Sequence, residues 1–405
     1  MNLLNINNYH YRRGGSDVMY FEHASIMQEE GWACAYFSMK HPNNIESPWS
    51  TNFIEELEYG HDYGLTRKAV SAMKVIYSWE AKSKLKKLLS DFRADIAHLH
   101  CIYHHITPSI IPLLEDRGVP IVMTAHDLKI ACPAYKMLNK NGVCERCVGG
   151  SYLNLIKNKC IHDSYLQSTL IAIESSVHRY LKSYQSINKI IAPSKFYKEK
   201  FIQAGYSEQQ IVYIPNFVDT PLTVDSLVFG EYYLYFGRLS NEKGILTLVK
   251  AFENSRVKLK IVGGGPMANE LKEFIGSGQY NVELCGHKTG LELTEIIKGS
   301  RAVILPSEWY ENAPMSVLES FSLGKPVIGS RIGGIPEMVQ DGLTGFLFES
   351  GNKQDLSNVI IKFNSLSLGE YLYMGSNCRD LISQSFSKQA YKNRIRDLYS
   401  SILSQ

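Results

Sequence analysis

The chain has 405 residues and a formal net charge of +3, with 44% hydrophobic and 20% charged residues. This length exceeds one ordinary hydrophobic core and predicts two domains. The small net charge gives no basis for a nucleic-acid partner, and no stretch reaches the ~18–20 uninterrupted apolar residues of a membrane span. The N-terminus lacks a basic region followed by an apolar run, so we expect no secretory signal and a cytoplasmic location.

The first apolar run, Leu3–Ile6, predicts a strand. A loop containing Gly14-Gly15 follows it, and a helical pattern then extends from about Val18 to Glu30. A glycine pair between the first strand and its helix lets the backbone approach a ligand closely. A flexible turn is the alternative interpretation. Gly14 and Gly15 are therefore candidate ligand-binding residues.

Residues 33–38 predict the second strand, and the aperiodic stretch 41–63 has the right position for a loop that contacts an acceptor. Residues 66–91 show a helical pattern with a short run of lysines. One interpretation is a basic helix resting on an anionic membrane. The other, favoured because the run is short, is a solvated helix face. In that case the residues packing inward are Val75, Ile76, Leu85, Leu88 and Leu89.

Three histidines are associated with the next predicted strands. His98 and His100 lie in the run 96–100, and the strand 119–124 brings His126 to its carboxyl end. A helix is expected between them, near residues 108–117. Ligands in open α/β sheets gather at strand carboxyl ends, so His126 is a candidate catalytic residue. His98 and His100 are equally well explained as buried, hydrogen-bonding residues.

The segment 131–161 interrupts the alternation of strands and helices and contains four cysteines: Cys132, Cys144, Cys147 and Cys160. The Cys-x-x-Cys pair flanked by further cysteines resembles a zinc site, in which two thiolates on a tight turn share one tetrahedral metal. The outer spacings differ from those of a standard finger. A structural zinc competes with a redox or incidental cluster, and four thiolate ligands would leave no open position for catalysis by zinc.

A helix from about residue 165 to 182, a strand at 189–194, a helix to residue 204 and a strand at 211–214 complete the first half. The proline-bracketed, non-periodic stretch 215–221 then marks a boundary. We expect an N-terminal, acceptor-side domain at 1–216, with the cysteine-rich insertion 131–161, and a C-terminal domain at 217–385. A terminal helix at 386–405 would pack back on the N-terminal domain.

Apolar runs alternate regularly with helical segments in the second half. This spacing predicts βαβ units and a parallel sheet. With the looser pattern of the first half, it predicts an α/β protein of two Rossmann-like domains facing each other. The runs begin near Tyr232, Leu259, Val282, Ala302, Val327 and Phe346.

Arg238 and Lys243 flank the loop after the first of these strands, where a diphosphate would need positive charge. The alternative is a pair of surface cations, with Lys243 bridged to Glu242. After the next strand, residues 263–268 match G-x-G-x-x-A. They do not open the first βαβ unit, so the match is weak evidence for NAD. The glycine at position 265 instead indicates that the backbone of this loop approaches a ligand closely.

The stretch 307–319 reads S-E-W-Y-E-N-A-P-M-S-V-L-E and follows a buried-strand pattern. Pro314 suits the start of a helix, which places Glu311 before the helix and Glu319 inside it. The free N–H groups between the two acids favour an anion. A poorly hydrated carboxylate at Glu319 needs a partner. Ribose hydroxyls would serve, and an internal ion pair is the alternative.

Taken together, these motifs resemble the retaining glycosyltransferases of family 4, which have the GT-B fold. The resemblance spans nearly the whole chain, and the motifs occur in the family order. They are Gly14-Gly15, T-A-H-D at 124–127, G-R-L-x-x-E-K-G at 237–244, V-G-G-G-P at 262–266 and E-N-A-P-M-S-V-L-E at 311–319. Asp17 replaces the glutamate that the family usually has near its Gly-Gly loop.

The resemblance implies a role for each matching position. Arg238 and Lys243 would hold the donor diphosphate, in place of a metal, and offset charge on the leaving group. Glu319 would bind the ribose, and Gly15 would approach the phosphate. His126 would contact the sugar near the reacting carbon. Glu311, with the backbone around Asn312, Ala313 and Pro314, would contact the donor sugar and phosphate.

The implied reaction is sugar transfer with retained configuration from a nucleoside-diphosphate sugar to a glycan or lipid-linked acceptor. Surface polysaccharide biosynthesis is the expected setting. The resemblance implies that catalysis needs no cofactor, and the chain has no Asp-x-Asp motif that would suggest otherwise. The expected location is the cytoplasm, and the alternative is peripheral contact with the inner face of the membrane. A nucleotide-sugar epimerase of the same fold and a non-catalytic nucleotide-binding subunit are the alternatives.

Overall fold

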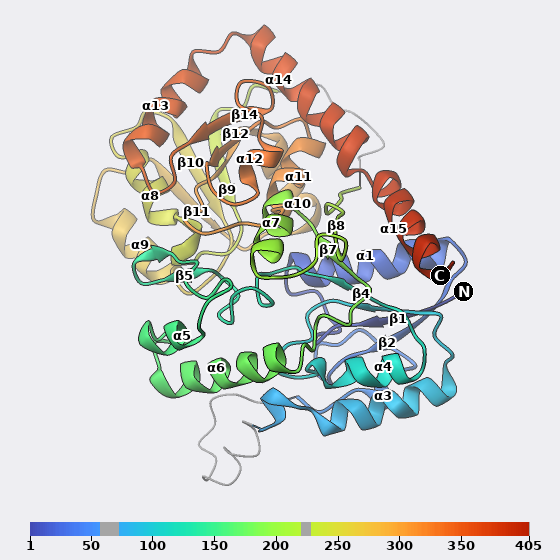
Figure 1. The fold of residues 1–405 in the computed structure, drawn as a ribbon. Coiled ribbons are helices and arrows are strands. Elements are labelled where there is room, and N and C mark those ends of the chain that lie inside the picture. Colours follow the sequence, from blue (N-terminus) through green and yellow to red (C-terminus); the bar gives the residue numbers. More distant parts are fainter. Residues whose placement is uncertain (57–72, 220–227, 405) are drawn as a thin grey trace. The chain divides into compact units, whose positions relative to one another are not determined.

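The computed structural model describes residues 1–56, 73–219 and 228–404. The chain separates into two compact units (Figure 1). Unit 1 comprises Met1–Ile214 with Arg394–Gln405, and unit 2 comprises Pro215–Asn393. The sequence predicts these two divisions after residue 216 and after residue 385. Each unit contains a six-stranded sheet, so the prediction of a two-domain α/β protein is confirmed.

The sheet of unit 1 has the strand order β2-β1-β3-β4-β7-β8, and all its pairs are parallel. β3 and β4 are buried along their whole length, as expected for parallel strands covered on both faces. The strands are β1 (Asn2–Ile6), β2 (Ala33–Phe37), β3 (Ile96–Leu99), β4 (Ile121–Thr124), β7 (Lys189–Ala192) and β8 (Ile211–Tyr213). The main helices are α1 (Gly15–Glu29), α3 (Trp79–Asp91), α4 (Ile111–Asp116), α6 (Tyr165–Tyr180) and α7 (Lys195–Gln203).

The sheet of unit 2 has the order β11-β10-β9-β12-β13-β14 and is likewise parallel. All six predicted strands are confirmed. They are β9 (Tyr232–Phe236), β10 (Lys258–Val262), β11 (Val282–Gly286), β12 (Ser300–Leu305), β13 (Val327–Ser330) and β14 (Gly345–Phe348). The helices are α8 (Ile245–Ala251), α9 (Ala268–Gly276), α10 (Gly290–Lys298), α11 (Met315–Ser322), α12 (Ile335–Met338), α13 (Lys353–Asn364) and α14 (Leu368–Leu381).

Strand register brings the functional loops of each unit to one sheet edge. In unit 1, Ile6 pairs with Leu99 and Leu99 with Met123, so the chain leaves β1, β3 and β4 at nearly the same level. In unit 2, Phe236 pairs with Val262 at the ends of β9 and β10. Because the strands are parallel, residues that are distant in sequence meet at these carboxyl ends.

The predicted helix at 66–91 is interrupted. Residues 66–72 lie outside the described part of the chain, residues 73–76 are helical, and Tyr77-Ser78 break the helix before α3 begins. Ser78 has an extended backbone, and its hydroxyl accepts a hydrogen bond from the Ala81 N–H at 3.2 Å. This is an N-cap, which starts a helix rather than continuing one. The apolar side of α3 packs inward through Leu85 and Leu88.

Unit 2 buries a lysine that the sequence did not single out. Lys325 is 2% exposed, and its Nζ donates to the carbonyls of Val228 and Ser300 at 2.8 and 2.9 Å. Burial lowers its pKa to about 8. The side chain thereby ties the segment before β9 to the start of β12.

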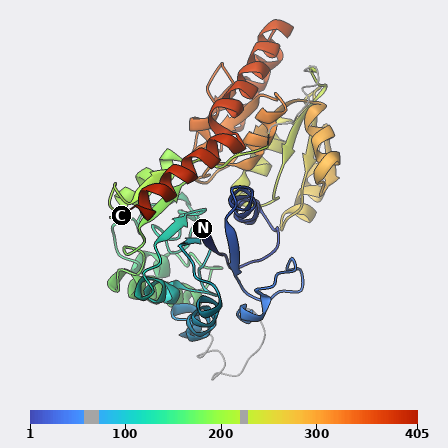
Figure 2. The same cartoon turned by 90° about the vertical axis from the view of Figure 1, so that its right-hand side faces the viewer.

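The C-terminal helix α15 (Lys388–Leu403), drawn in red in Figure 2, ends in the part of the chain that belongs to unit 1. Its Tyr399 is buried, and the hydroxyl bonds two buried histidines, His23 Nε2 at 2.9 Å and His98 Nδ1 at 2.6 Å. His23 lies on α1 and His98 on β3, so Tyr399 joins three elements of the unit.

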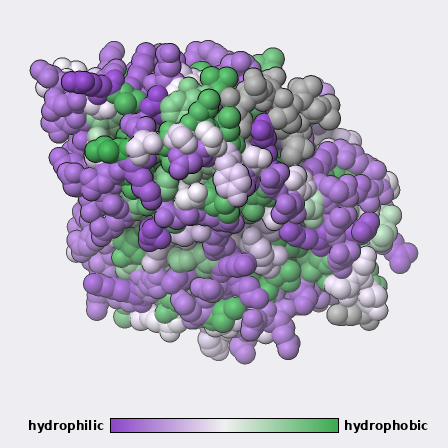
Figure 3. All heavy atoms as spheres, turned by 90° about the horizontal axis from the view of Figure 1, so that it is seen from above, coloured by the Kyte–Doolittle hydropathy of each residue, from purple (hydrophilic) through white to green (hydrophobic). Residues whose placement is uncertain are grey.

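The face of the molecule shown in Figure 3 is mainly hydrophilic, with apolar residues in small groups. Among the described helices, none is both long enough and apolar enough to cross a membrane.

Tyr399→Phe should destabilise the protein. The substitution keeps the ring but removes the hydroxyl that joins His23 and His98, and the loss of these buried hydrogen bonds should cost about 1–3 kcal/mol. Thermal unfolding monitored by circular dichroism measures the effect. Tyr373→Phe on α14, where the side chain is exposed, is the matched control. Equal Tm values for the two variants would contradict this role for Tyr399.

Candidate active-site residues

The carboxylate of Glu311 is the centre of a hydrogen-bond cluster in unit 2. Glu311 is 6% exposed. Its Oε1 accepts hydrogen bonds from Lys243 Nζ at 2.6 Å, Ser307 Oγ at 2.6 Å and Trp309 Nε1 at 2.9 Å. A buried carboxylate is tolerated only when it is paired and hydrogen-bonded, and Glu311 satisfies both conditions. Sequence reasoning missed Ser307 and Trp309 as its partners.

Lys243 reaches Glu311 because β9 and β12 are neighbours in the sheet, so their carboxyl-end loops lie side by side. Gly244 adopts φ 66°, and a side chain there would collide with the carbonyl of Pro306 in the loop after β12. The two loops therefore need glycine at this position to approach each other. The salt bridge of Lys243 is to Glu311, so the alternative pairing with Glu242 is wrong.

Arg238 lies in the same loop as Lys243 but on its exposed side. The Tyr235 hydroxyl donates to the Arg238 carbonyl at 2.8 Å, which fixes the backbone there. Within residues 1–56, 73–219 and 228–404, the Arg238 guanidinium forms no salt bridge. The loop thus presents one cation held by a carboxylate and one that is not.

The glycines at 263 and 265 are needed where two loops of the protein approach each other. Gly263 adopts φ 147° and Gly265 φ 158°, and side chains at these positions would meet the backbone of Gly237 and Leu239 respectively. Leu239 N–H donates to the Gly264 carbonyl at 2.9 Å. The close approach at Gly265 is therefore between two loops of the protein. A role for Gly265 in donor binding stays a prediction.

Glu319 lies in α11, and Pro314 is the N-cap of that helix. Burial raises the Glu319 pKa to about 7. In the described part of the chain no salt bridge reaches Glu319, so the alternative of an internal ion pair finds no support. Just before the helix, Asn216 Nδ2 donates to the Ala313 carbonyl at 3.1 Å, and Ala313 is buried. Asn312 and Pro314 are partly exposed beside it.

In unit 1, Gly14 is the N-cap of α1 and is exposed together with Gly15. A side chain at Gly14 would meet no atom within 4 Å. Asp17, in the first turn, is 1% exposed and accepts hydrogen bonds from Asn7 Nδ2 at 3.0 Å and Arg13 Nε at 3.3 Å. Its carboxylate is thus occupied in holding the loop that leads into α1.

His126 follows β4 at the same sheet edge. Its Nε2 lies 2.9 Å from Nδ1 of His100, the residue directly after the neighbouring strand β3. Burial lowers the pKa of His126 to about 4, so the ring is neutral at physiological pH. Asp127 Oδ1 accepts the Lys129 N–H at 2.8 Å, and burial raises the Asp127 pKa to about 6.

The four cysteines of the insertion are free thiols and approach one another in unit 1. Burial first, and then the neighbouring thiols, raise the pKa of Cys147 to about 12. The insertion contains a short hairpin of β5 (Leu138–Asn139) and β6 (Gly142–Val143), followed by α5 (Leu153–Lys157). Among the described residues, no three His, Cys, Asp or Glu side chains form a group that could hold a metal ion as they stand. Zinc binding by Cys132, Cys144, Cys147 and Cys160 stays a prediction.

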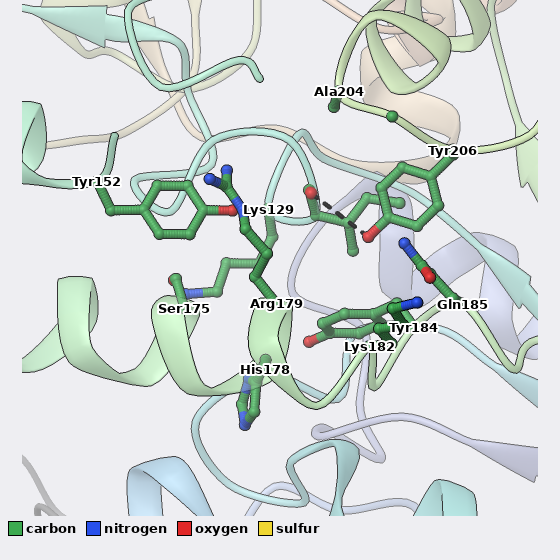
Figure 4. A pocket seen from close by; sticks show the side chains of 12 residues that line it. Lys129, Tyr152, Ser175, His178, Arg179, Lys182, Tyr184, Gln185, Ala204 and Tyr206 are labelled. Carbon is green, nitrogen blue, oxygen red and sulfur yellow. Dashed lines mark hydrogen bonds between the residues drawn. The ribbon is translucent and has the colours of Figure 1, made fainter. Parts of the chain in front are cut away.

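A pocket beside the insertion is lined by cations that include Lys129 and Arg179, and both of these bond to other groups of the protein (Figure 4). Lys129 Nζ bonds the buried carboxylate of Glu174 at 2.8 Å. Arg179 lies over the Tyr152 ring at 3.7 Å and donates to the Gly150 carbonyl at 2.6 Å. The two Arg179 contacts join the cysteine-rich insertion to α6, and no ligand is assigned to the pocket.

Comparison with known proteins identifies the family. The model of Glycosyltransferase Family 4 matches residues 13–221, and the model of Glycosyl transferases group 1 matches residues 230–380. The chain belongs to glycosyltransferase family 4. It is an enzyme of the glycosyltransferase class, EC 2.4, and its two parallel α/β sheets fit the GT-B fold. Neither alternative, epimerase or non-catalytic subunit, is supported by these matches.

Relatives cover both units. N-acetyl-alpha-D-glucosaminyl L-malate synthase of Bacillus anthracis is 22% identical over 96% of this chain and 94% of its own. A UDP-Gal:alpha-D-GlcNAc-diphosphoundecaprenol alpha-1,3-galactosyltransferase of Escherichia coli is 26% identical over 59% of this chain and 67% of its own. Among solved structures, sucrose-phosphate synthase of Thermosynechococcus elongatus has TM-score 0.73 at 18% identity, covering 100% of this chain and 99% of that one. Anabaena HepE in complex with UDP and glucose has TM-score 0.68 at 18% identity, covering 99% and 100%.

Glu319→Gln should change how stability depends on pH. Unfolded glutamate has a pKa near ~4.3, whereas burial raises the folded value to about 7. Between these values the folded protein holds a proton that the unfolded chain has released, so stability falls as pH rises through this range. The variant should match wild type near pH 4 and be more stable at pH 8, by at most about 4 kcal/mol. Urea unfolding at both pH values measures this.

Glu270→Gln in α9 is the control for the Glu319 variant, because Glu270 is exposed. It should show the wild-type pH dependence. A Glu319→Gln variant that is less stable than wild type at pH 8 would show that the carboxylate has a stabilising partner.

Metal analysis of the purified protein tests the cysteine cluster. If Cys132, Cys144, Cys147 and Cys160 bind a structural zinc, we expect about one equivalent per chain, lost together with stability on chelation. Cys285, outside the insertion, gives the control substitution Cys285→Ser, which should keep the metal. Less than about half an equivalent of zinc, with the four thiols open to titration, would end the zinc prediction.

Proposed function

We propose that this glycosyltransferase transfers a sugar from a nucleoside-diphosphate donor to a hydroxyl of a glycan or lipid-linked acceptor, with retained configuration at the anomeric carbon. Cell-surface polysaccharide biosynthesis, in the cytoplasm or at the inner face of the membrane, is the proposed setting. The observation that carries the proposal is the position of Lys243. Its ammonium group forms a salt bridge with Glu311, and the same loop carries the exposed Arg238. The loops that carry these residues follow the adjacent strands β9 and β12.

The choice of donor is supported by this charge arrangement and by the HepE complexes, which contain UDP, UDP with glucose, or UDP-glucose. A diphosphate needs positive charge near a strand terminus, and Arg238 and Lys243 supply two cations. Glu319 would accept hydrogen bonds from the ribose hydroxyls. Such binding would provide hydrogen-bond partners for this partly buried carboxyl.

In the proposed reaction the bond from the anomeric carbon to the diphosphate oxygen breaks, and a bond to the acceptor oxygen forms on the same face. The acceptor proton passes to the departing diphosphate. Arg238 and Lys243 stabilise the negative charge that develops on the leaving group, which is commonly the largest catalytic contribution. Because these side chains provide the positive charge, the proposal requires no metal in the chemical step.

Wild-type protein incubated with a panel of nucleotide-sugars and glycan or lipid-linked acceptors should release nucleoside diphosphate and form a glycoside. NMR of the product should show the same anomeric configuration as the donor. Lys243→Ala should lower kcat by about 10²–10³-fold, the range for losing one preorganised electrostatic contact. Lys250→Ala, in the exposed part of α8, is the matched control and should keep wild-type kcat.

Inversion at the anomeric carbon would overturn the retaining assignment and leave the transferase function intact. Lys243→Ala with wild-type kcat would remove Lys243 from the mechanism. Absence of turnover with every donor and acceptor, for folded wild-type protein, would count against the proposed substrates.

A further inference from the structure

The rings of His100 and His126 are joined edge to edge. His100 Nδ1 and His126 Nε2 are 2.9 Å apart, while the ring centroids are 5.2 Å apart and the planes differ by 14°. The centroid separation is close to the nitrogen–nitrogen distance plus the two ring radii. The rings therefore lie nearly in one plane, and the hydrogen bond lies within that plane rather than between stacked faces.

Both imidazoles are neutral at physiological pH. Burial lowers the pKa of His126 to about 4 and that of His100 well below its ordinary value. A neutral imidazole carries one N–H and one acceptor nitrogen. Two arrangements are then open: either His100 Nδ1 donates to His126 Nε2, or His126 Nε2 donates to His100 Nδ1.

The second nitrogen of His100 distinguishes the two arrangements. His100 Nε2 is buried and has no hydrogen-bond partner among the residues that the structure describes. If His126 donated, the single proton of His100 would sit on this nitrogen as a buried donor without an acceptor. If His100 donates, the nitrogen is only an unused acceptor. Buried N–H groups without partners are rarer than under-used acceptors, so His100 is the donor.

The His100 ring is held firmly enough to impose this choice. His100 is 1% exposed, and its backbone N–H donates to the Ile6 carbonyl at 2.8 Å. The His98 ring lies against it at a centroid distance of 4.7 Å and 17°. The Tyr20 ring packs at 5.3 Å and 78°. These contacts come from β1, β3 and α1, which form the interior of unit 1.

We propose that His100 is a positioning residue that sets the tautomer of His126. His100 Nδ1–H occupies His126 Nε2 and keeps the His126 proton on Nδ1. The inference rests on the proposed function and on the role that the family resemblance implies for His126, contact with the donor sugar. His126 then meets the sugar through Nδ1 as a hydrogen-bond donor to a sugar oxygen. It does not serve as a general base, because one nitrogen is already accepting and the other carries the proton.

The tautomer can be measured directly in the full-length protein. Long-range ¹⁵N–¹H correlation NMR on ¹⁵N-histidine-labelled protein distinguishes Nδ1–H from Nε2–H, and the His126→Gln variant identifies the His126 signals by their loss. Wild type should show His126 protonated on Nδ1. His100→Asn places an amide nitrogen where Nδ1 was and should keep this tautomer. His100→Phe retains a planar ring without the donor and should lose it.

Kinetics provide the second readout. His100→Phe should lower kcat by about 10–100-fold, the range for removing a group that orients a functional histidine. KM for the donor should change less than about threefold, and His100→Asn should recover most of the lost kcat. His178→Phe is the matched control. His178 is a buried histidine of the same unit whose Nε2 bonds the Ile76 carbonyl at 2.8 Å, so the variant loses a comparable bond without touching His126.

A wild-type His126 protonated on Nε2 would overturn the inference, as would a His100→Phe variant with unchanged tautomer and kcat. If His100→Phe does not fold, the spectra of wild type and His100→Asn decide. The tautomer is read in the free protein, so it tests His100 even if no donor is turned over. Turnover with the opposite tautomer would leave the transferase function standing and remove only this role.

Discussion

The salt bridge between Lys243 and Glu311 is the constraint on which the site in unit 2 depends. It joins the loops after β9 and β12, and the glycine at position 244 is required for these loops to meet. A partly buried ion pair of this kind does not have to stabilise the fold, because desolvation of both charges opposes their attraction. Its effect is positional: it fixes the ammonium group of Lys243 at one point on the sheet edge. Ser307 and Trp309 donate to the same carboxylate oxygen, so three donors hold the Glu311 side chain in place.

In unit 1, neutral groups fix the side chains at the sheet edge. Its sheet edge carries imidazoles instead of an ion pair, and burial keeps them uncharged. Direction is then given by hydrogen bonds alone. Tyr399 bonds His98 and His23 at one end of the cluster, and His100 bonds His126 at the other. Neutral rings avoid the desolvation cost that four neighbouring cations would carry, and each ring still has one donor and one acceptor to assign.

The strands and the loops that carry the site could be predicted because they follow from local patterns. Short apolar runs separated by helical segments predict a parallel sheet, and a parallel sheet brings its functional loops to one edge. The break at Ser78 could not be predicted, because the apolar spacing continues across it and only the backbone reveals the cap. The partners of Glu311 and the burial of Lys325 depend on which loops meet in space. The same limit applies to Gly265, whose sequence context indicates a ligand while its neighbour in the structure is Leu239.

Glu311 and Glu319 show how far residue type alone can mislead. They are eight positions apart in one stretch, but Glu311 is buried and Glu319 is only partly buried, and their surroundings differ. Glu311 accepts three hydrogen bonds, one of them from a cation. Glu319 has burial without a salt bridge in the described chain, and its pKa rises to about 7. A carboxyl that is already satisfied holds its own protein in place, whereas one left short of partners gains most from a ligand that donates hydrogen bonds. These different surroundings support the proposal that Glu311 orders the loops around Lys243 and that Glu319 recognises the ligand.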